Sequence, residues 1–112
     1  MTEGMSLDQY QQWTESTAVY PRIDELPYLT LGLVGEAGEI ANKVKKILRD
    51  QNGVMTIGDM DAISDELGDC LWYLARLADI TGNSLTMIVR QNVEKLEDRK
   101  RRGVLGGSGD QR

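Results

Sequence analysis

Two stretches decide the fold: residues 31–48, which read LGLVGEAGEIANKVKKIL, and residues 56–78, which read TIGDMDAISDELGDCLWYLARLA. In both, apolar side chains recur at every third or fourth position, and this spacing gives a helix an apolar face. The apolar positions are Leu31, Val34, Ala41, Val44 and Leu48 in the first stretch and Met60, Ile63, Leu67, Cys70, Leu71, Leu74, Leu77 and Ala78 in the second. The sequence therefore predicts two long helices that bury these faces.

Capping and turn residues extend the pattern to four helices. They are Ser6 with Gln9, Pro21, Pro27, Asn52-Gly53, Thr56 with Asp59, Thr81-Gly82-Asn83, and Ser84. These signals predict a short first helix before Pro21, the two long helices, and a fourth helix from Ser84 to Arg102. We expect an all-α four-helix bundle over residues 1–102, followed by a glycine-rich tail over residues 103–112.

The composition excludes several kinds of site. The 112 residues include 13 Lys and Arg, 18 Asp and Glu, one cysteine and no histidine. A His-based triad, a His-ligated zinc and an internal disulfide are therefore excluded. The net charge of −5 argues against general nucleic-acid binding. No apolar run approaches the ~20 residues of a membrane span, and no signal peptide is evident, so we expect a cytoplasmic protein without a membrane partner.

Four carboxylates occupy matched positions on the two long helices. Glu36 and Glu39 are three residues apart on one helix, and Glu66 and Asp69 are three apart on the other. Two carboxylates ~6 Å apart repel by roughly 3 kcal/mol at an effective dielectric of 20, so convergence of all four calls for a divalent cation. Without histidine, Mg²⁺ or Mn²⁺ suits such a site. The alternative is an ordinary polar surface on which Glu39 pairs with Lys43.

These segments resemble the MazG-like nucleotide pyrophosphohydrolases, an all-α superfamily. Its signature is ExxE followed some two dozen residues later by ExxD, and here 26 residues separate Glu39 from Glu66. The similarity extends through residues 92–99 and 102–104. It implies hydrolysis of a nucleoside triphosphate between its α- and β-phosphates, with two or more Mg²⁺ or Mn²⁺ ions. The implied metal ligands are Glu36, Glu39, Glu66 and Asp69, and Glu39 is the expected catalytic base.

Five further residues are expected to contact the substrate. Tyr73 lies one turn beyond Asp69, Asn92 lies beside the apolar stripe of the fourth helix, and Trp13 offers an aromatic ring. Lys95 and Arg99 are one turn apart and suit the leaving phosphates. The alternatives are core packing for Trp13 and Tyr73, a buried structural amide for Asn92, and a solvated helix end for the two cations. The resemblance also suggests that the glycine-rich tail covers the nucleotide.

The resemblance further implies a homo-oligomer, either a dimer or a tetramer built as a dimer of dimers, in which neighbouring chains complete the bundle. Glycines at positions 32, 35 and 38 would let backbones approach closely. The leading hypothesis is a pyrophosphohydrolase acting on the deoxynucleotide pool, without a fixed base preference. One alternative is a non-catalytic helical oligomer that binds an ion or a protein partner. Another is a nucleic-acid-binding bundle that uses residues 99–102.

Overall fold

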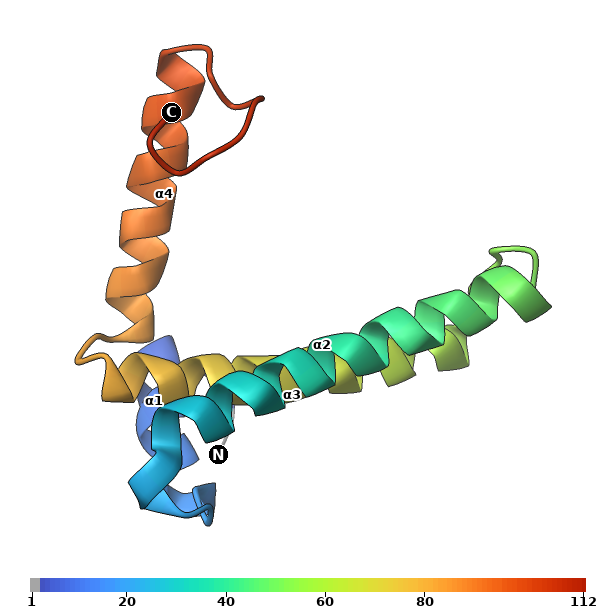
Figure 1. The fold of residues 1–112 in the computed structure, drawn as a ribbon, viewed down its shortest axis with the longest axis horizontal. Coiled ribbons are helices and arrows are strands. Elements are labelled where there is room, and N and C mark those ends of the chain that lie inside the picture. The colour runs from blue at the N-terminus through green and yellow to red at the C-terminus, as the bar shows by residue number, and fades with distance from the viewer. Residues whose placement is uncertain (1–2) are drawn as a thin grey trace.

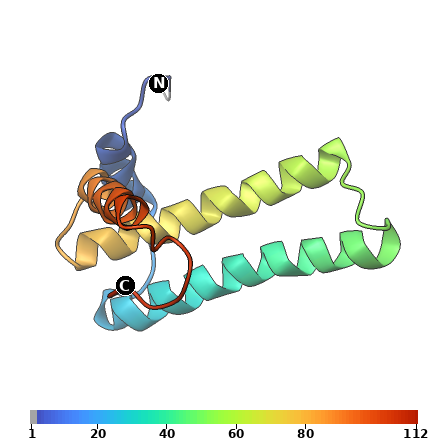
Figure 2. The ribbon, with the colours of Figure 1, turned by 90° about the horizontal axis from the view of Figure 1, so that it is seen from above.

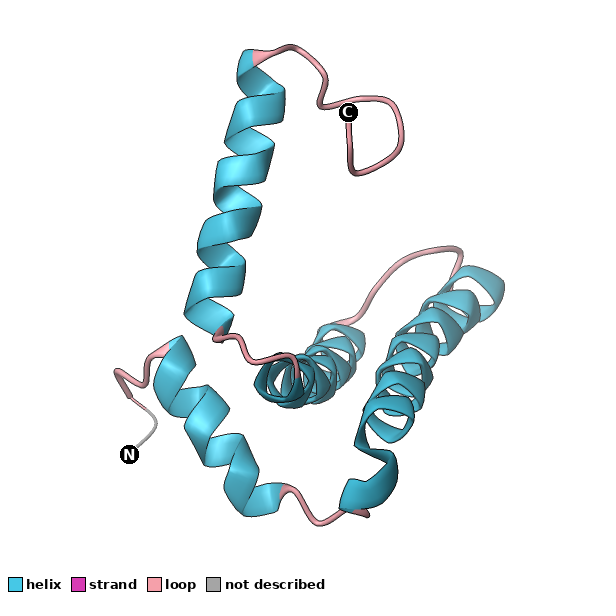
Figure 3. Ribbon diagram, turned by 60° about the vertical axis from the view of Figure 1, so that its left-hand side comes forward, coloured by secondary structure: helices cyan, strands magenta, loops and turns pink. Residues whose placement is uncertain are grey.

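The computed structural model describes residues 3–112, which fold into four α-helices and two short 3₁₀ helices with no strand in that range (Figure 3). In chain order, the helices are α1 (Leu7–Thr14), η1 (Glu15–Thr17), η2 (Arg22–Asp24), α2 (Glu25–Asp50), α3 (Ile57–Ile80) and α4 (Leu85–Arg101). The predicted all-α fold is confirmed.

Helices α2 and α3 form a long antiparallel hairpin (Figure 2). The turn between them contains Asn52 with φ 52° and Gly53 with φ 77°, which are left-handed conformations that asparagine and glycine tolerate. Thr56 then caps α3: its hydroxyl accepts from the Asp59 amide, and the Asp59 carboxylate accepts from the Thr56 amide. This hairpin carries all four predicted metal ligands.

A buried arginine ties α1 to the far end of α3. Arg76 is 2% exposed, and its guanidinium pairs with Glu15 at 2.7 Å and with Asp79 at 2.6 Å. It also donates to the Thr14 and Tyr20 hydroxyls. Since Thr14, Glu15 and Tyr20 belong to α1 and the segment after it, this network fixes the first helix against α3.

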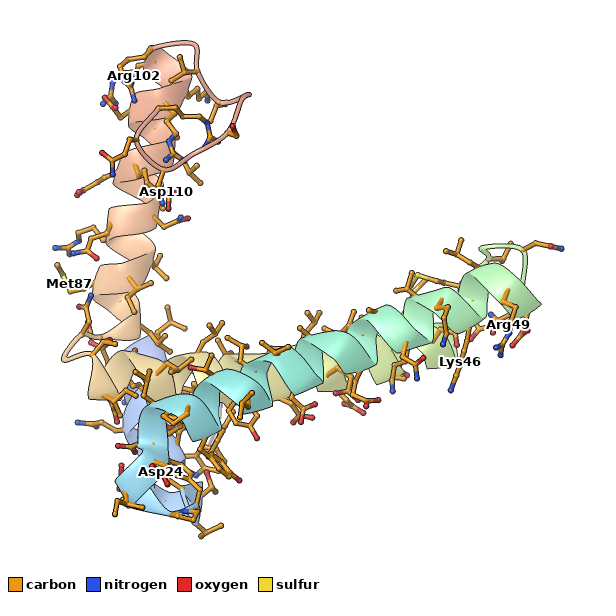
Figure 4. The ribbon with its side chains drawn as sticks, in the orientation of Figure 1. Asp24, Lys46, Arg49, Met87, Arg102 and Asp110 are labelled. Carbon is orange, nitrogen blue, oxygen red and sulfur yellow. The ribbon has the colours of Figure 1, made fainter. Side chains whose placement is uncertain are left out.

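Helix α4 starts at the end of the hairpin and extends away from it (Figure 1). Its start is anchored, because Leu85 packs against Ala75 and Ala78 and its amide donates to Gln11 at 2.6 Å. The remainder of α4 points away from the rest of the chain (Figure 1). The glycine-rich tail folds back beside α4 and not over the hairpin. Asp110 of the tail lies next to α4 (Figure 4).

The tail is closed by arginines. Arg112 donates to the carbonyls of residues 104, 105, 106 and 109, and Arg102 donates to the Arg112 carbonyl. The Arg99 guanidinium donates to the backbone carbonyl of Asp110 at 2.8 Å. The expected covering of a nucleotide by this tail stays a prediction.

The predicted apolar stripe of α2 is exposed in the single chain, contrary to expectation. Leu31, Val34 and Leu48 are 72%, 64% and 65% exposed, whereas Leu29 and Ile47 on another face are buried. The radius of gyration is 17.0 Å, against about 13 Å for a compact chain of this length. The surface area is 8007 Å², against about 6,200 Å² for a compact monomer of this mass. Each long helix therefore leaves apolar surface uncovered.

No helix within residues 3–112 is both long enough and apolar enough to cross a membrane.

Candidate functional site

Three of the four predicted ligands meet between α2 and α3. Glu36 from α2 and Glu66 and Asp69 from α3 each place a carboxylate oxygen within 4.8 Å of the others. Glu36 and Glu66 are partly buried, and Asp69 is exposed. The meeting follows from the antiparallel pairing, which sets the middle of one helix beside the middle of the other.

Glu39 lies one turn beyond Glu36 and is exposed. It is not among the three carboxylates that meet within 4.8 Å, although its negative charge helps to raise the pKa of Glu36. The alternative expectation was an ion pair between Glu39 and Lys43. Instead, Lys43 pairs with Glu66 on the facing helix, with Nζ 3.3 Å from Oε1. Lys43 is therefore a neighbour of the acidic cluster, a position that its sequence pattern did not predict.

The cluster favours the protonated form of Glu36. The facing Glu66 carboxylate, burial, and the charges of Asp69 and Glu39 raise the pKa of Glu36 to about 7. The same contact with Glu36 and the neighbouring Lys43 lower the pKa of Glu66, so Glu66 stays ionised. One proton is thus shared where two carboxylates face each other, as expected for like charges without a counter-ion.

A hollow of about 340 Å³ opens beside the acids, and aromatic side chains form much of its wall. Its lining residues are Trp13, Thr17, Glu36, Asp69, Trp72 and Tyr73. The Trp72 ring stands edge-on to Tyr73, with ring centroids 5.1 Å apart, and Trp13 stacks on Tyr10 at 6.0 Å. Of the predicted substrate contacts, Tyr73 and Trp13 therefore lie next to the carboxylates.

Tyr73 occupies space that a glycine leaves open. A Cβ atom placed on Gly32 of α2 would overlap the Tyr73 ring, so the ring lies directly against the α2 backbone. At Gly35 and Gly38 a Cβ would meet nothing within 4 Å in the described part of the chain. Gly32 is therefore the glycine of this helix that the site requires.

The three predicted contacts on α4 are not brought to the acids within one chain. Asn92 and Lys95 line a separate shallow hollow with Ile88 and Gln91. Arg99 is 4% exposed and donates to the backbone carbonyl of Asp110 in the tail, and Lys95 Nζ lies 3.7 Å from the Asp110 carboxylate. To contact the phosphates of a nucleotide at the acids, these three residues would have to reach the site of another copy of the chain.

Thr17 and Trp72 line the hollow although the sequence analysis did not select them. Trp72 Nε1 donates to Thr17 Oγ1 at 2.7 Å, which joins η1 to α3 across 55 residues of sequence. Trp72 precedes Tyr73 and lies three residues after Asp69, and this proximity is the one signal that could have identified it. Thr17 has no comparable signal.

The chain is similar to proteins of a known family. The model of the MazG nucleotide pyrophosphohydrolase domain matches residues 26–104, which contain all of α2 after its first residue, α3, α4 and the three converging carboxylates. The chain belongs to the MazG family. It is also 51% identical over 114 residues to the Gene 37 protein of Mycobacterium phage L5, an alignment that covers 96% of this chain and 100% of that relative. No solved structure matches it.

MazG proteins are generally dependent on divalent metal ions, and the cluster suits such an ion. Within residues 3–112, no N–H or hydroxyl group donates to Glu66 Oε2, although this oxygen is buried. A buried carboxylate oxygen without a donor is costly, and a cation or a proton on Glu36 can satisfy it. The converging ligands are all carboxylate oxygens, which Mg²⁺ and Mn²⁺ prefer.

Proposed function

We propose that this MazG-family protein hydrolyses nucleoside triphosphates of the cytoplasmic deoxynucleotide pool between the α- and β-phosphates. The products are a nucleoside monophosphate and pyrophosphate. The observation that carries the proposal is the convergence of Glu36, Glu66 and Asp69 within 4.8 Å beside a hollow walled by aromatic rings. Carboxylates at one side and ring faces at the other suit the two ends of a metal-bound nucleotide.

The four predicted ligands, Glu36, Glu39, Glu66 and Asp69, would hold Mg²⁺ or Mn²⁺, with two or more ions per site. A bound ion offsets phosphate charge and lowers the pKa of a water molecule. Glu39 is exposed and lies one turn from the three converging carboxylates, so at the edge of the metal site its carboxylate would also accept the proton of the attacking water. The aromatic side chains at the hollow would orient the base.

The open shape supports assembly into a homo-oligomer. The accessible surface exceeds that of a compact monomer by about 1,800 Å², more than the ~800 Å² that each partner buries in a standard interface. The excess coincides with exposed apolar faces on α2, α3 and α4. A dimer, or a tetramer as a dimer of dimers, would cover these faces and bring Asn92, Lys95 and Arg99 of one chain towards the acids of another.

The test is a panel of the canonical dNTPs and NTPs with Mg²⁺ or Mn²⁺, with monophosphate, diphosphate, pyrophosphate and phosphate resolved. We expect monophosphate plus pyrophosphate, lost in EDTA. Glu66→Gln should abolish turnover and Glu39→Gln should lower kcat by about 10²-fold or more, as for loss of a general base. Asp61→Asn makes the same charge change at an exposed position of α3 and should leave activity unchanged.

Two results would overturn the proposal. Release of diphosphate and phosphate would place the cleavage elsewhere. No turnover of any nucleotide with either metal would favour the non-catalytic oligomer that binds an ion or a protein partner.

A further inference from the structure

Helix α2 carries a lysine on the face that it turns towards α3. The buried and partly buried positions around Lys43 are Glu36, Ile40 and Ile47, which recur every three or four residues and so share one face of the helix. The Lys43 side chain is 33% exposed, whereas Lys46 one turn later lies at an exposed position. An ammonium group on an inner helix face needs a partner for its charge.

The partner of Lys43 is one oxygen of Glu66, and the other oxygen of Glu66 is left without a partner. Lys43 Nζ lies 3.3 Å from Oε1, and the Glu66 side chain is 16% exposed. Within residues 3–112, Oε2 is buried and accepts no hydrogen bond. In the same range, Lys43 is the one Lys or Arg that forms an ion pair with any of the three converging carboxylates. Oε2 is therefore the oxygen of Glu66 that gains most from a bound cation.

We propose that Lys43 is a positioning residue of the metal site, which holds Glu66 Oε1 so that Oε2 is presented to the ion. This inference rests on the proposed function, because that function depends on a metal bound at these acids. A carboxylate that ligates a metal is oriented by the partner of its other oxygen, and loss of such a partner costs about 10- to 100-fold in metal affinity or activity.

The charge of Lys43 acts in the opposite direction to its pairing. An ammonium group repels a divalent cation nearby, so a lysine that acted through charge alone would weaken metal binding. Water screens this repulsion because a third of the Lys43 side chain is exposed, whereas the order imposed on the more buried Glu66 does not depend on screening. The direction of the change on removing Lys43 therefore distinguishes positioning from charge.

The test measures binding of Mn²⁺ alone to the full chain, from the EPR signal of the unbound ion. Lys43→Met keeps an unbranched side chain between Ile40 and Ile47 and removes the ammonium group, so Mn²⁺ binding should weaken by about 10- to 100-fold. Lys46→Met makes the same charge change at an exposed position and should alter the affinity by less than about 3-fold. Unchanged or tighter Mn²⁺ binding in Lys43→Met would overturn the proposal.

A second substitution separates the pairing from the shape of the lysine. Lys43→Arg keeps a cation with N–H groups that can donate to Glu66 Oε1, so it should recover most of the affinity lost in Lys43→Met. Equal losses in the two variants would also overturn the proposal. Thermal unfolding in EDTA reports whether each variant is folded, and Lys43→Ala removes the same ammonium group if the methionine variant does not unfold cooperatively.

Because the measurement needs no nucleotide, its outcome is separable from that of the proposed function. If Mn²⁺ binds, no nucleotide is hydrolysed, and the affinity falls in Lys43→Met, then the catalytic assignment fails and the role of Lys43 stands. If nucleotides are hydrolysed while Lys43→Met binds Mn²⁺ as tightly as the wild type, the reverse holds. A wild-type protein that neither binds Mn²⁺ nor hydrolyses a nucleotide overturns both proposals.

Discussion

The metal-free cluster favours the protonated form of Glu36, so a metal ion competes with a proton at this carboxyl group. Its pKa of about 7 in the metal-free fold lies above the ordinary glutamate value of 4.5. A carboxyl group whose pKa is raised by folding contributes stability below pH 4.5, and this stability is lost as the pH rises through 7. In EDTA, we expect Tm to fall between pH 5 and pH 8.

The Glu36→Gln variant isolates this effect because the amide stays neutral at every pH. In EDTA at pH 8 it should be more stable than the wild type, and its Tm should depend less on pH. Mg²⁺ or Mn²⁺ should raise Tm more in the wild type than in the variant. A lower Tm of the variant at pH 8 in EDTA would contradict the shared proton.

Gly32 is required where the Tyr73 ring approaches α2. In Gly32→Ala the new methyl group would overlap the ring, so the ring must move out of its position in the hollow. We expect a loss of about 1–3 kcal/mol in the free energy of unfolding, as in other overpacked sites, and a raised KM.

The matched control is Gly35→Ala, where the new methyl group meets nothing within 4 Å. Alanine is the better helix former, so this variant should gain about 0.5–1 kcal/mol. Equal effects of the two substitutions, measured by urea unfolding, would show that the Tyr73 contact is unimportant.

At the scale of the elements, Arg76 holds α1 to α3. Its removal leaves the buried Thr14 hydroxyl and the Glu15 and Asp79 carboxylates without their shared donor. Arg76→Met should therefore cost about 3 kcal/mol of unfolding free energy. Arg49→Met removes an exposed pair with Asp50 and should change stability by no more than about 0.5 kcal/mol. Similar Tm values for the two variants would refute a structural role of the Arg76 network.

Local signals made most element boundaries predictable. The capping boxes of Ser6 and Thr56 and the Asn52-Gly53 turn act within a few residues, so the sequence contains the whole interaction. The i, i+3 spacing also predicted that four acids converge between two helices, and three of them, Glu36, Glu66 and Asp69, do meet there. The face of α2 that contacts α3 was not predictable, because α2 is apolar on two sides and the choice depends on its partner. The Thr17–Trp72 contact joins distant residues and leaves no local pattern.

At the scale of the whole molecule, the exposed apolar faces predict that stability depends on assembly. Val34 is 64% exposed in the single chain, and a lysine there would place a charge on the expected contact surface. We expect Val34→Lys to lower the oligomeric mass measured by light scattering and to lower Tm. Gln12→Lys makes the same charge change at an exposed polar position of α1 and should alter neither. A wild-type protein that is monomeric at all concentrations would contradict this expectation.

The position of α4 has a genetic consequence. Since Lys95 and Arg99 lie apart from the acids of their own chain, the two halves of a working site in the proposed oligomer would come from two polypeptide chains, which two gene copies can encode separately. A cell that carries Glu66→Gln in one copy and Lys95→Met in the other would form mixed assemblies with some intact sites. Two alleles that are each inactive alone would then complement each other, whereas two alleles altered in the acids would not.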